Sequence, residues 1–254
     1  MRRVPIDSAA LPQPGAASGT FSLPEQAVHY LATVLRLAPG EHVELFDGAG
    51  RSIEVALRSV TSTEVLVEII ADRSDEQLGE SALQITLYQA MPKGERWDWV
   101  LEKATELGVS RIVPLQTART VVSVPAAKLA SRIERWQKIA AGAARQSKRT
   151  LVPRIEAPAS VASALAKADE DFGLVAHTRT GCPTLTQAVV NKEYSCSASF
   201  GIWIGPEGGF EDSELAILLE HGVKECSLGP RILRSETAGI VAVALIQAAR
   251  GDMA

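Results

Sequence analysis

Two glycine-containing loops carry the residue types in this sequence that are best suited to binding and catalysis. Residues 205–210 read GPEGGF after a strand-like run, and residues 228–238 read LGPRILRSETA before an almost uncharged helix. Glycines let a backbone approach a ligand closely and turn N–H groups toward it. Arg231, Arg234 and Glu236 precede a helix apolar enough to be buried, where an unpaired charge is costly. Either these charges pair with one another or the loop is a site.

Each loop also has a purely structural interpretation. A GPEGG sequence is compatible with a tight turn that binds nothing, and no Lys-Ser/Thr pair follows it as a Walker A phosphate loop requires. In the second loop, Arg234 can pair with Glu236 or with Glu207. Ser235 or Thr237 can cap the helix that follows. Neither loop decides between these interpretations by itself.

Strand-like and helical segments divide the chain into two parts. Residues 1–73 are mostly β: HVELFDGAGRSIEVALRSV predicts two strands joined by a glycine turn, and EVLVEIIA predicts a third. Ser22 and Glu25, at capping-box spacing, predict a short helix before them. In residues 74–254 strands alternate with helices, including a long helix over 125–148, which predicts an α/β fold with a mostly parallel sheet covered on both faces. Ligands of such sheets bind beyond the carboxyl ends of the strands, where both loops would lie.

Composition excludes several classes of protein. The chain has 254 residues, 46% of them hydrophobic, with no apolar run long enough for a membrane span and no signal-peptide core at its start. Its three cysteines share no close spacing and its four histidines are scattered. This pattern argues for a reducing compartment and against a disulfide framework or a metal site. We therefore expect a cytoplasmic protein with no membrane partner and no metal.

The distribution of charge points to a polyanionic partner, although the net charge is −4. Residues 1–76 contain six basic and eleven acidic residues, whereas residues 128–154 contain eight basic residues and one acid. On a helical wheel one face about 120° wide collects Lys128, Arg132, Arg135, Lys138, Arg145 and Arg149. A local basic stripe of this kind is typical of a helix that faces phosphates, although an ordinary solvated face is the simpler alternative.

Taken together, GPEGGF and LGPRILRSETA resemble the motifs of the ribosomal RNA small subunit methyltransferase E family. Its members are SPOUT-class, S-adenosylmethionine-dependent enzymes that methylate N3 of a uridine in 16S rRNA. HYLATVLRL and FDGAG resemble the family's PUA-like barrel, and MPKGERWDWVLEKATELGVSRIVPLQTART and RWQKIAAGAARQSKR its catalytic domain. One position departs from the pattern: Arg145 stands before Gln146 and Ser147, where the family usually has Glu.

The resemblance implies a fold and an assembly. Residues 1–73 would form the PUA-like RNA-binding barrel, and residues 74–254 a SPOUT methyltransferase domain with a deep trefoil knot at its C-terminal end. The final helix would thread the loop that binds the cofactor and pack in a homodimer interface. That threading would explain why so uncharged a helix is buried next to an arginine loop.

The resemblance also implies site residues. The donor pocket for S-adenosylmethionine would be formed by Ile204, Gly205, Pro206, Glu207, Gly208, Gly209, Leu228, Gly229, Ile232, Leu233, Thr237 and Ala238. Arg234 would stabilise the charge on the uracil ring, and Glu207 would take the N3 proton. Contacts to 16S rRNA in the assembled small subunit would come from Arg36, Lys93, Arg96, Arg119, Lys138, Arg145, Lys148 and Arg149.

Three other functions remain open from the sequence. A SPOUT enzyme acting on tRNA or 23S rRNA differs from the leading hypothesis only in its substrate. A non-catalytic RNA-binding protein of ribosome assembly predicts a decayed donor pocket, yet both loops are intact here. A nucleotide-phosphate binder using GPEGG as an anion nest would ordinarily carry the P-loop lysine, which this chain lacks.

Overall fold

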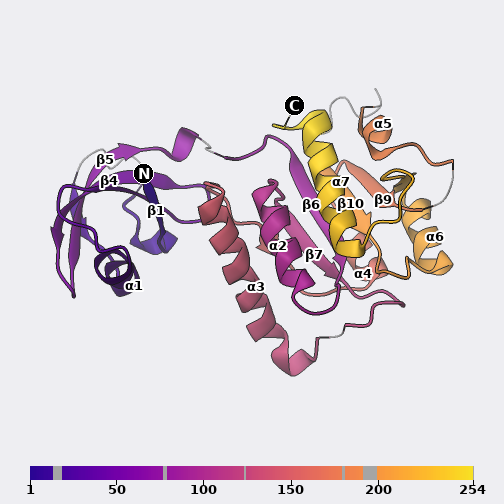
Figure 1. Ribbon diagram of the computed structural model, residues 1–254, viewed down its shortest axis with the longest axis horizontal. Coiled ribbons are helices and arrows are strands. Elements are labelled where there is room, and N and C mark those ends of the chain that lie inside the picture. Colours follow the sequence, from indigo (N-terminus) through magenta and orange to yellow (C-terminus); the bar gives the residue numbers. More distant parts are fainter. Residues whose placement is uncertain (14–18, 77–78, 123, 179–180, 191–198, 254) are drawn as a thin grey trace. The chain divides into compact units, whose positions relative to one another are not determined.

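The computed structural model describes residues 1–13, 19–76, 79–122, 124–178, 181–190 and 199–253. They form two compact units (Figure 1): Met1–Glu80 with Ala144–Val152, and Ser81–Ala143 with Pro153–Ala254. The division expected at residues 73 and 74 did not anticipate that Ala144–Val152 packs with the first unit. A return of this kind depends on tertiary contacts, which local sequence patterns do not encode.

The first unit is built on a five-stranded sheet. In sheet order its strands are β1 (Arg2–Pro5), β3 (His42–Phe46), β4 (Ser52–Val60), β5 (Val65–Asp72) and β2 (Thr20–Ser22), and β1 pairs with β3 in parallel while the other pairs are antiparallel. The alternating residues Val43, Leu45, Val55 and Leu57 are fully buried and form the core. The two strands predicted around the glycine turn are therefore confirmed as β3 and β4.

Short helical segments cover this sheet. They are η1 (Ser8–Ala10), α1 (Glu25–His29), the π-helical turn η2 (Tyr30–Val34) and η3 (Ser74–Glu76). The helix predicted after Ser22 is present, but the capping box is wrong. Ser22 lies in β2 and its hydroxyl donates to Glu64, while Pro24 occupies the N-cap position. Ser22 belongs to β2 and not to the helix cap because the backbone of Ser22 pairs with β5.

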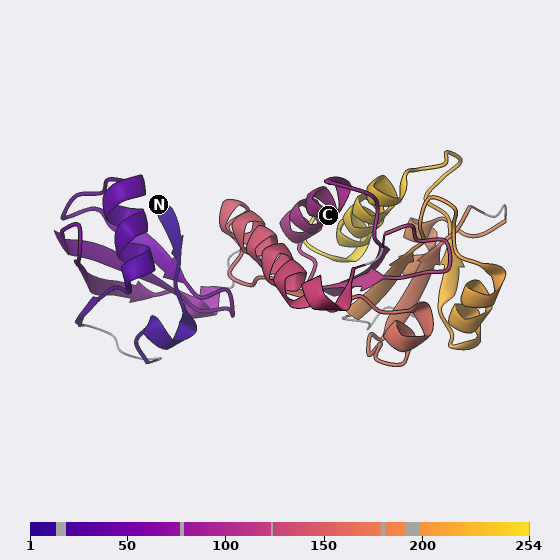
Figure 2. The same cartoon turned by 90° about the horizontal axis from the view of Figure 1, so that it is seen from below.

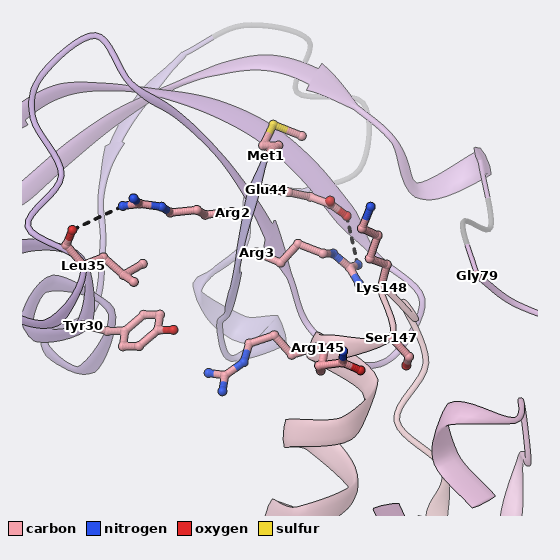
Figure 3. A pocket seen from close by; sticks show the side chains of 11 residues that line it. Met1, Arg2, Arg3, Tyr30, Leu35, Glu44, Gly79, Arg145, Ser147 and Lys148 are labelled. Atoms are coloured by element: carbon pink, nitrogen blue, oxygen red, sulfur yellow. Dashed lines mark hydrogen bonds and ion pairs between the residues drawn. The ribbon is translucent and has the colours of Figure 1, made fainter. Parts of the chain in front are cut away.

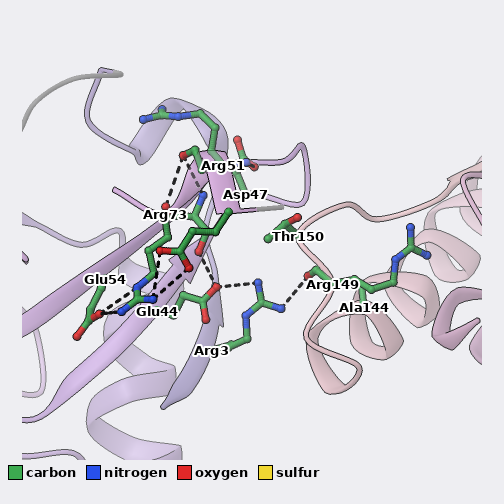
Figure 4. A network of polar contacts seen from close by, with 12 residues as sticks. Arg3, Glu44, Asp47, Arg51, Glu54, Arg73, Ala144, Arg149 and Thr150 are labelled. Carbon is green, nitrogen blue, oxygen red and sulfur yellow. Dashed lines mark hydrogen bonds and ion pairs between the residues drawn. The ribbon is translucent and has the colours of Figure 1, made fainter. Parts of the chain in front are cut away.

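Buried polar contacts hold Ala144–Val152 within the first unit, and Figure 4 shows the hydrogen bond from Arg3 to Arg149. Arg3 Nη2 lies 2.9 Å from the Glu44 carboxylate, and Arg3 Nη1 donates to the Arg149 carbonyl at 2.8 Å. The Arg149 guanidinium bonds the Glu80 carboxylate at 2.9 Å, and its residue is only 3% exposed. The expected exposed position of Arg149 on the basic helix face is therefore wrong, because the helix ends at Gln146 and Arg149 turns inward to Glu80.

The second unit contains a six-stranded sheet in which every pair is parallel. In sheet order its strands are β11 (Lys224–Cys226), β9 (Phe172–Ala176), β10 (Ser199–Ile204), β6 (Gln84–Ala90), β7 (Arg111–Leu115) and β8 (Arg154–Ile155). The parallel sheet predicted from alternating strands and helices is confirmed. The adjacent central strands β10 and β6 bring the segments that follow Ile204 and Ala90 to one edge.

Helices cover both faces of this sheet, as Figure 2 shows for α2 and α7 on one side and α4 and α6 on the other. The helices are α2 (Arg96–Glu106), α3 (Ala126–Gln146), α4 (Val161–Leu165), α5 (Leu185–Val189), α6 (Asp212–Glu220) and α7 (Ser235–Arg250). α7 packs on β6, β10, α2 and α5. Its inward side includes the buried residues Gly239, Ala242, Val243 and Ile246.

Candidate functional site

The two glycine-containing loops meet at the carboxyl edge of the parallel sheet. Residues 205–211 follow β10, and residues 227–234 follow β11 and lead into α7. The Ser235 hydroxyl, in the first turn of α7, donates to the carbonyl of Gly205 at 2.6 Å. Ser235 is thus not a helix cap, since Arg234 holds that position without a side-chain bond. It is the residue that joins the two loops.

Gln89, from the central strand β6, completes this link from inside the core. Its Nε2 donates to the Ser235 hydroxyl at 2.8 Å, and its side chain is fully buried. A polar side chain is stable in such a place only when it is hydrogen-bonded. The chain of bonds Gln89–Ser235–Gly205 therefore fixes strand, helix and glycine loop in one arrangement.

Gly239 makes room for this arrangement. A Cβ atom built on Gly239 would lie 2.2 Å from Gln89 Oε1 and 3.6 Å from Leu87 Cδ1. A glycine inside a helix normally costs stability relative to alanine, so its presence here reflects the close approach of α7 to β6.

The GPEGG segment forms a tight turn. The Gly209 N–H donates to the Pro206 carbonyl at 2.8 Å, and Gly209 has φ +70°, in the left-handed region that favours glycine. At Gly205 a Cβ would lie 3.1 Å from the Phe210 nitrogen. The loop is therefore packed against its own residues at Gly205, whereas Glu207 and Gly208 are exposed to solvent.

Unpaired backbone donors line both loops. Within the described part of the chain, no hydrogen bond is made by the backbone N–H groups of Glu207, Gly208, Leu228, Ile232 and Leu233. Backbone donors of this kind are normally satisfied by protein, water or a ligand. Two loops that each present several of them, and that Ser235 holds together, form a cradle for a ligand rich in acceptors.

A cation lies between Glu207 of the glycine loop and Glu236 in the first turn of α7. Arg96, at the start of α2, places Nη1 3.7 Å from Glu207 Oε1 and Nε 3.6 Å from Glu236 Oε1. Glu236 is 7% exposed, and its Oε2 has no hydrogen-bond partner among the described residues. The charges next to the apolar helix are thus balanced by an arginine from a different element.

Arg234, in contrast, is exposed and has no acidic partner among the described residues. Neither of the pairings that the sequence suggested for it, with Glu236 or with Glu207, is present in the described structure, where Arg96 takes both acids. An exposed guanidinium at the mouth of a cradle of backbone donors remains available to a ligand.

Arg119 supports the glycine loop from β7's side of the sheet. Its Nη1 donates to the Gly208 carbonyl at 2.7 Å, and its Nε lies 4.0 Å from Glu211. The sequence assigned Arg119 to RNA contact, and the structure adds a positioning contact that local patterns gave no reason to expect.

The remaining predicted cofactor residues lie in or beside the same two loops. Ile204 and Pro206 are buried, Leu228, Leu233, Thr237 and Ala238 are half-buried, and Gly229 is exposed. Ile232, expected as an apolar lining residue, is 87% exposed. An apolar side chain so open to water is a natural place for a ligand or a second chain to cover.

The predicted RNA-binding residues are distributed over both units. Lys93 and Arg96 lie after β6 near the cradle, and exposed Lys138 pairs with Glu134 on α3. The other exposed or half-buried members, Arg36, Arg145 and Lys148, belong to the first unit. The structure thus places Arg96 and Arg119 against the cradle, and with the buried Arg149 it places four of the predicted residues in the first unit.

Comparisons with known proteins identify the family. Residues 79–247 match the model of the RNA methyltransferase domain, and residues 23–70 match that of the RNA methyltransferase PUA domain. This chain belongs to the RNA methyltransferase family. It is 33% identical to the ribosomal RNA small subunit methyltransferase E of Bacillus subtilis, over 92% of this chain and 93% of that protein.

Solved structures agree in fold over the full length. The ribosomal RNA small subunit methyltransferase E of Neisseria gonorrhoeae, bound to S-adenosyl methionine, has a TM-score of 0.85 at 32% identity and covers 100% of both chains. A putative methyltransferase of Legionella pneumophila with bound S-adenosyl methionine has a TM-score of 0.83 at 34% identity, covering 98% of each chain. The expected family and the expected class, an α/β SPOUT-type domain after a PUA-like barrel, are confirmed.

Three residues that contact the cradle were not among the predicted site residues. Gln89 looks like an ordinary strand residue, Ser235 looks like a helix cap, and Glu236 looks like a first-turn acid. A glycine in the middle of a mostly apolar helix was the available signal, since such a residue marks a close approach. Gly239 is that glycine.

Metal sites and membrane spans are both absent from the described residues. No group of three or more His, Cys, Asp or Glu side chains is arranged to hold a metal ion in the described ranges. No helix in the same residues is long and apolar enough to cross a membrane.

Proposed function

We propose that this protein methylates N3 of a specific uridine in 16S rRNA, with S-adenosylmethionine as the methyl donor. One observation carries the proposal: two intact loops with unpaired backbone donors are locked together by Ser235 and Gly205. The relatives named as small-subunit rRNA methyltransferases, and the related structures that contain the donor, support the same reaction class.

The residues of the cradle fit the donor. The adenine and methionine parts of S-adenosylmethionine are rich in acceptors and polar edges, and the free N–H groups of Glu207, Gly208, Leu228 and Leu233 suit them. Ile204 and the half-buried Leu233 supply apolar contact. When bound, the donor supplies an electrophilic methyl group on a sulfonium sulfur.

Arg234 holds the charge that develops on the uracil ring. Loss of the N3 proton leaves negative charge spread over the ring oxygens O2 and O4. A guanidinium donates two parallel hydrogen bonds and keeps its own proton at any accessible pH. An exposed and unpaired Arg234 is free to take this position without breaking another ion pair.

Glu207 is our candidate for the group that accepts the N3 proton. It is exposed in the glycine loop, and its Oε1 lies 3.7 Å from Arg96 Nη1. As the N3–methyl bond forms and the sulfur–methyl bond breaks, the N3 proton moves to the Glu207 carboxylate. The buried Glu236 instead holds Arg96 in place from the opposite side.

The C-terminal part of the chain suits a trefoil knot, which we propose for residues 199–250. β11 lies at the edge of the sheet beside β9, yet α7 returns to pack on the central strands β6 and β10. This return carries the chain past Gly205 in the loop that follows β10. Knots are rare in proteins, and in this class the knot would brace the donor cradle.

We also propose a homodimer that forms through α7. The side of this helix away from Gly239 presents the half-buried apolar residues Ile240, Val241, Ala244 and Leu245. The exposed Ile232 precedes them in the arginine loop. Covering such a surface with a second copy removes apolar area from water. Light scattering on purified protein should therefore give the dimer mass, and Leu245→Lys should lower it toward the monomer.

The first experiment is methyl transfer from radiolabelled S-adenosylmethionine. The substrates are small ribosomal subunits that lack the modification, with naked 16S rRNA and tRNA in parallel, and the labelled RNA is digested to nucleosides. We expect label in 3-methyluridine from assembled subunits, in keeping with a cytoplasmic protein. Label in tRNA would keep the reaction and overturn the substrate, and donor binding without label in any RNA would favour a non-catalytic RNA-binding protein.

Variants then separate the assigned roles. Arg234→Lys keeps the charge but loses the planar pair of donors, so we expect a large fall in kcat with little change in donor affinity. Glu207→Gln should flatten the acid limb of the pH–rate profile. If Glu236→Gln does so and Glu207→Gln does not, the proton goes to Glu236 instead.

A further inference from the structure

A cavity in the first unit has the charge of a site for a polyanion. It has a volume of about 740 Å³ and is lined chiefly by β1, by η2 with the residue after it, and by the returning segment Ala144–Val152. Its charged lining residues are four cations and one carboxylate: Arg2, Arg3, Arg145, Lys148 and Glu44. All of them belong to the first unit, whereas the two loops of the donor cradle belong to the second.

The one carboxylate of this cavity is already neutralised. Glu44 is buried against Arg3 at 2.9 Å and also accepts a hydrogen bond from Ser52 at 2.5 Å. Arg2 donates to the carbonyl of Leu35 at 3.2 Å and keeps its other donors. Among the described residues, Arg2, Arg145 and Lys148 have no acidic partner, so the cavity carries an excess of three positive charges.

The side chains that carry this excess are held at the cavity (Figure 3). The Arg145 guanidinium lies 5.6 Å from the centre of the Tyr30 ring, within cation–π range. The positions of these two residues, one in η2 and one at the end of α3, are fixed by the fold of the unit. The aromatic ring also gives a nucleobase a surface against which to lie.

The backbone beside the cavity is strained at two cations. Arg36 (φ +51°) and Lys148 (φ +63°) are the two non-glycine residues with positive φ in the described part of the chain. The left-handed region is unfavourable for a residue with a Cβ atom. Gly79 lies against the turn at Lys148, since a Cβ there would be 2.9 Å from the Lys148 carbonyl oxygen. Glycine would relieve the backbone strain at position 148, so the presence of a lysine there indicates that its positive charge has a function.

We propose that this cavity binds a phosphate of single-stranded RNA, as a second contact with the substrate in addition to the donor cradle. A concave site of this size accommodates one nucleotide. Three uncompensated cations fit the RNA backbone better than a neutral ligand, because each neutralised phosphate releases counterions. The inference rests on the proposed function in one respect: it takes the substrate of this enzyme to be RNA.

The test uses the full-length protein and a fluorescent single-stranded RNA of about twelve nucleotides. Binding is followed by anisotropy from about 0.05 to 0.2 M salt for Arg145→Gln, for Lys148→Gly and for the double variant. Each lost phosphate contact should lower the slope of log K against log salt by about 0.7. At about 0.15 M salt this corresponds to a Kd roughly fourfold higher for each variant and about fifteenfold higher for the double variant.

Two control measurements separate loss of the phosphate contact from loss of the fold or of net charge. Lys148→Gly removes the charge while relaxing φ, so its melting temperature should stay equal to that of the native protein or rise. Arg58→Gln makes the same change in net charge in the same unit, but Arg58 is exposed and already paired with Glu68. This control should leave the slope unchanged. If the cavity variants behave like Arg58→Gln, the proposal is wrong.

Two further experiments, phosphate binding and methyl transfer, distinguish an RNA site from a small-anion site and separate this inference from the proposed function. If inorganic phosphate binds the native protein more tightly than the cavity variants while all of them bind RNA equally well, the cavity is a small-anion site and the RNA assignment is overturned. In methyl transfer we expect the double variant to raise KM for RNA and leave kcat and donor affinity unchanged. A native protein that binds RNA through the cavity yet methylates no RNA would overturn the proposed function and leave this inference standing.

Discussion

Replacing Gly239 with alanine tests the geometry on which the donor cradle depends. The new methyl group would lie 2.2 Å from Gln89 Oε1, so one of the two residues must move by roughly 1 Å to reach ordinary contact. Overpacking of this kind costs about 1–3 kcal/mol, and a buried amide that loses its partner costs about 1–3 kcal/mol more. Alanine returns up to about 1 kcal/mol through its helix propensity. We therefore expect Gly239→Ala to lower the free energy of unfolding by about 1–5 kcal/mol.

The same displacement should weaken donor binding. When Gln89 moves, Ser235 loses its hydrogen-bond donor and the bond from Ser235 to Gly205 is no longer fixed. A hydrogen bond worth about 0.5–1.5 kcal/mol corresponds to a two- to twelvefold change in affinity. Denaturation followed by tryptophan fluorescence reports the second unit, because all four tryptophans lie there. Calorimetry with S-adenosylmethionine gives the affinity.

Two further variants make the outcome decisive. Gly142 lies within α3 with nothing within 4 Å of a built Cβ, so Gly142→Ala should stabilise the protein by up to about 1 kcal/mol. In the double variant Gln89→Ala/Gly239→Ala the clash is gone, and the combined loss should be smaller than the sum of the single losses. A Gly239→Ala protein as stable as the native chain, with unchanged donor affinity, would refute the reasoning.

Three further predictions concern single side chains. Ser235→Ala should weaken S-adenosylmethionine binding by up to about tenfold in calorimetry while leaving the far-ultraviolet circular dichroism spectrum unchanged. Hydrogen bonds from His42 and Arg73 hold the pKa of Glu54 below its usual value, so its stabilising contribution is present at neutral pH and is lost as the pH falls through the lowered pKa. Urea unfolding followed by circular dichroism between about pH 5 and pH 3 should therefore show a shallower loss for Glu54→Gln than for the native chain. Burial raises the pKa of Cys226 to about 12, so mass spectrometry should find this thiol unmodified after alkylation of the folded protein at about pH 8.

The sequence predicted the elements of both units because local patterns determine them. Alternation at residues 42–60 gave two strands, and the change from strand to helix along residues 74–254 gave the parallel sheet. Both site loops were found for the same reason, since a glycine turn between a strand and a helix is a local feature. The long helix predicted over 125–148 begins one residue later and ends two residues earlier, at Ala126–Gln146.

What the sequence did not predict depends on contacts between distant residues. Gln89 and Ser235 are 146 positions apart, and no local sequence pattern near either residue predicts the hydrogen bond between them. The sequence placed Arg149 at the end of a basic helix face, but in the structure Arg149 forms a buried ion pair with Glu80 in the first unit. Periodicity places a side chain on a face of its own helix, but it contains no information about which distant acid will pair with it.

Neutral and charged side chains have different roles at the site. Neutral buried groups fix the position of the loops: the Gln89 amide and the Ser235 hydroxyl bond to each other and to the Gly205 carbonyl at no cost in buried charge. The charged groups are arranged differently: exposed Arg234 has no acidic partner among the described residues, and Arg96 is shared between exposed Glu207 and buried Glu236. A charge used as a structural link would be unavailable to stabilise a charge on the substrate. The uncharged helix therefore positions the arginine loop through neutral hydrogen bonds, and Arg234 is left without an acidic partner among the described residues, as the role that we propose for it requires.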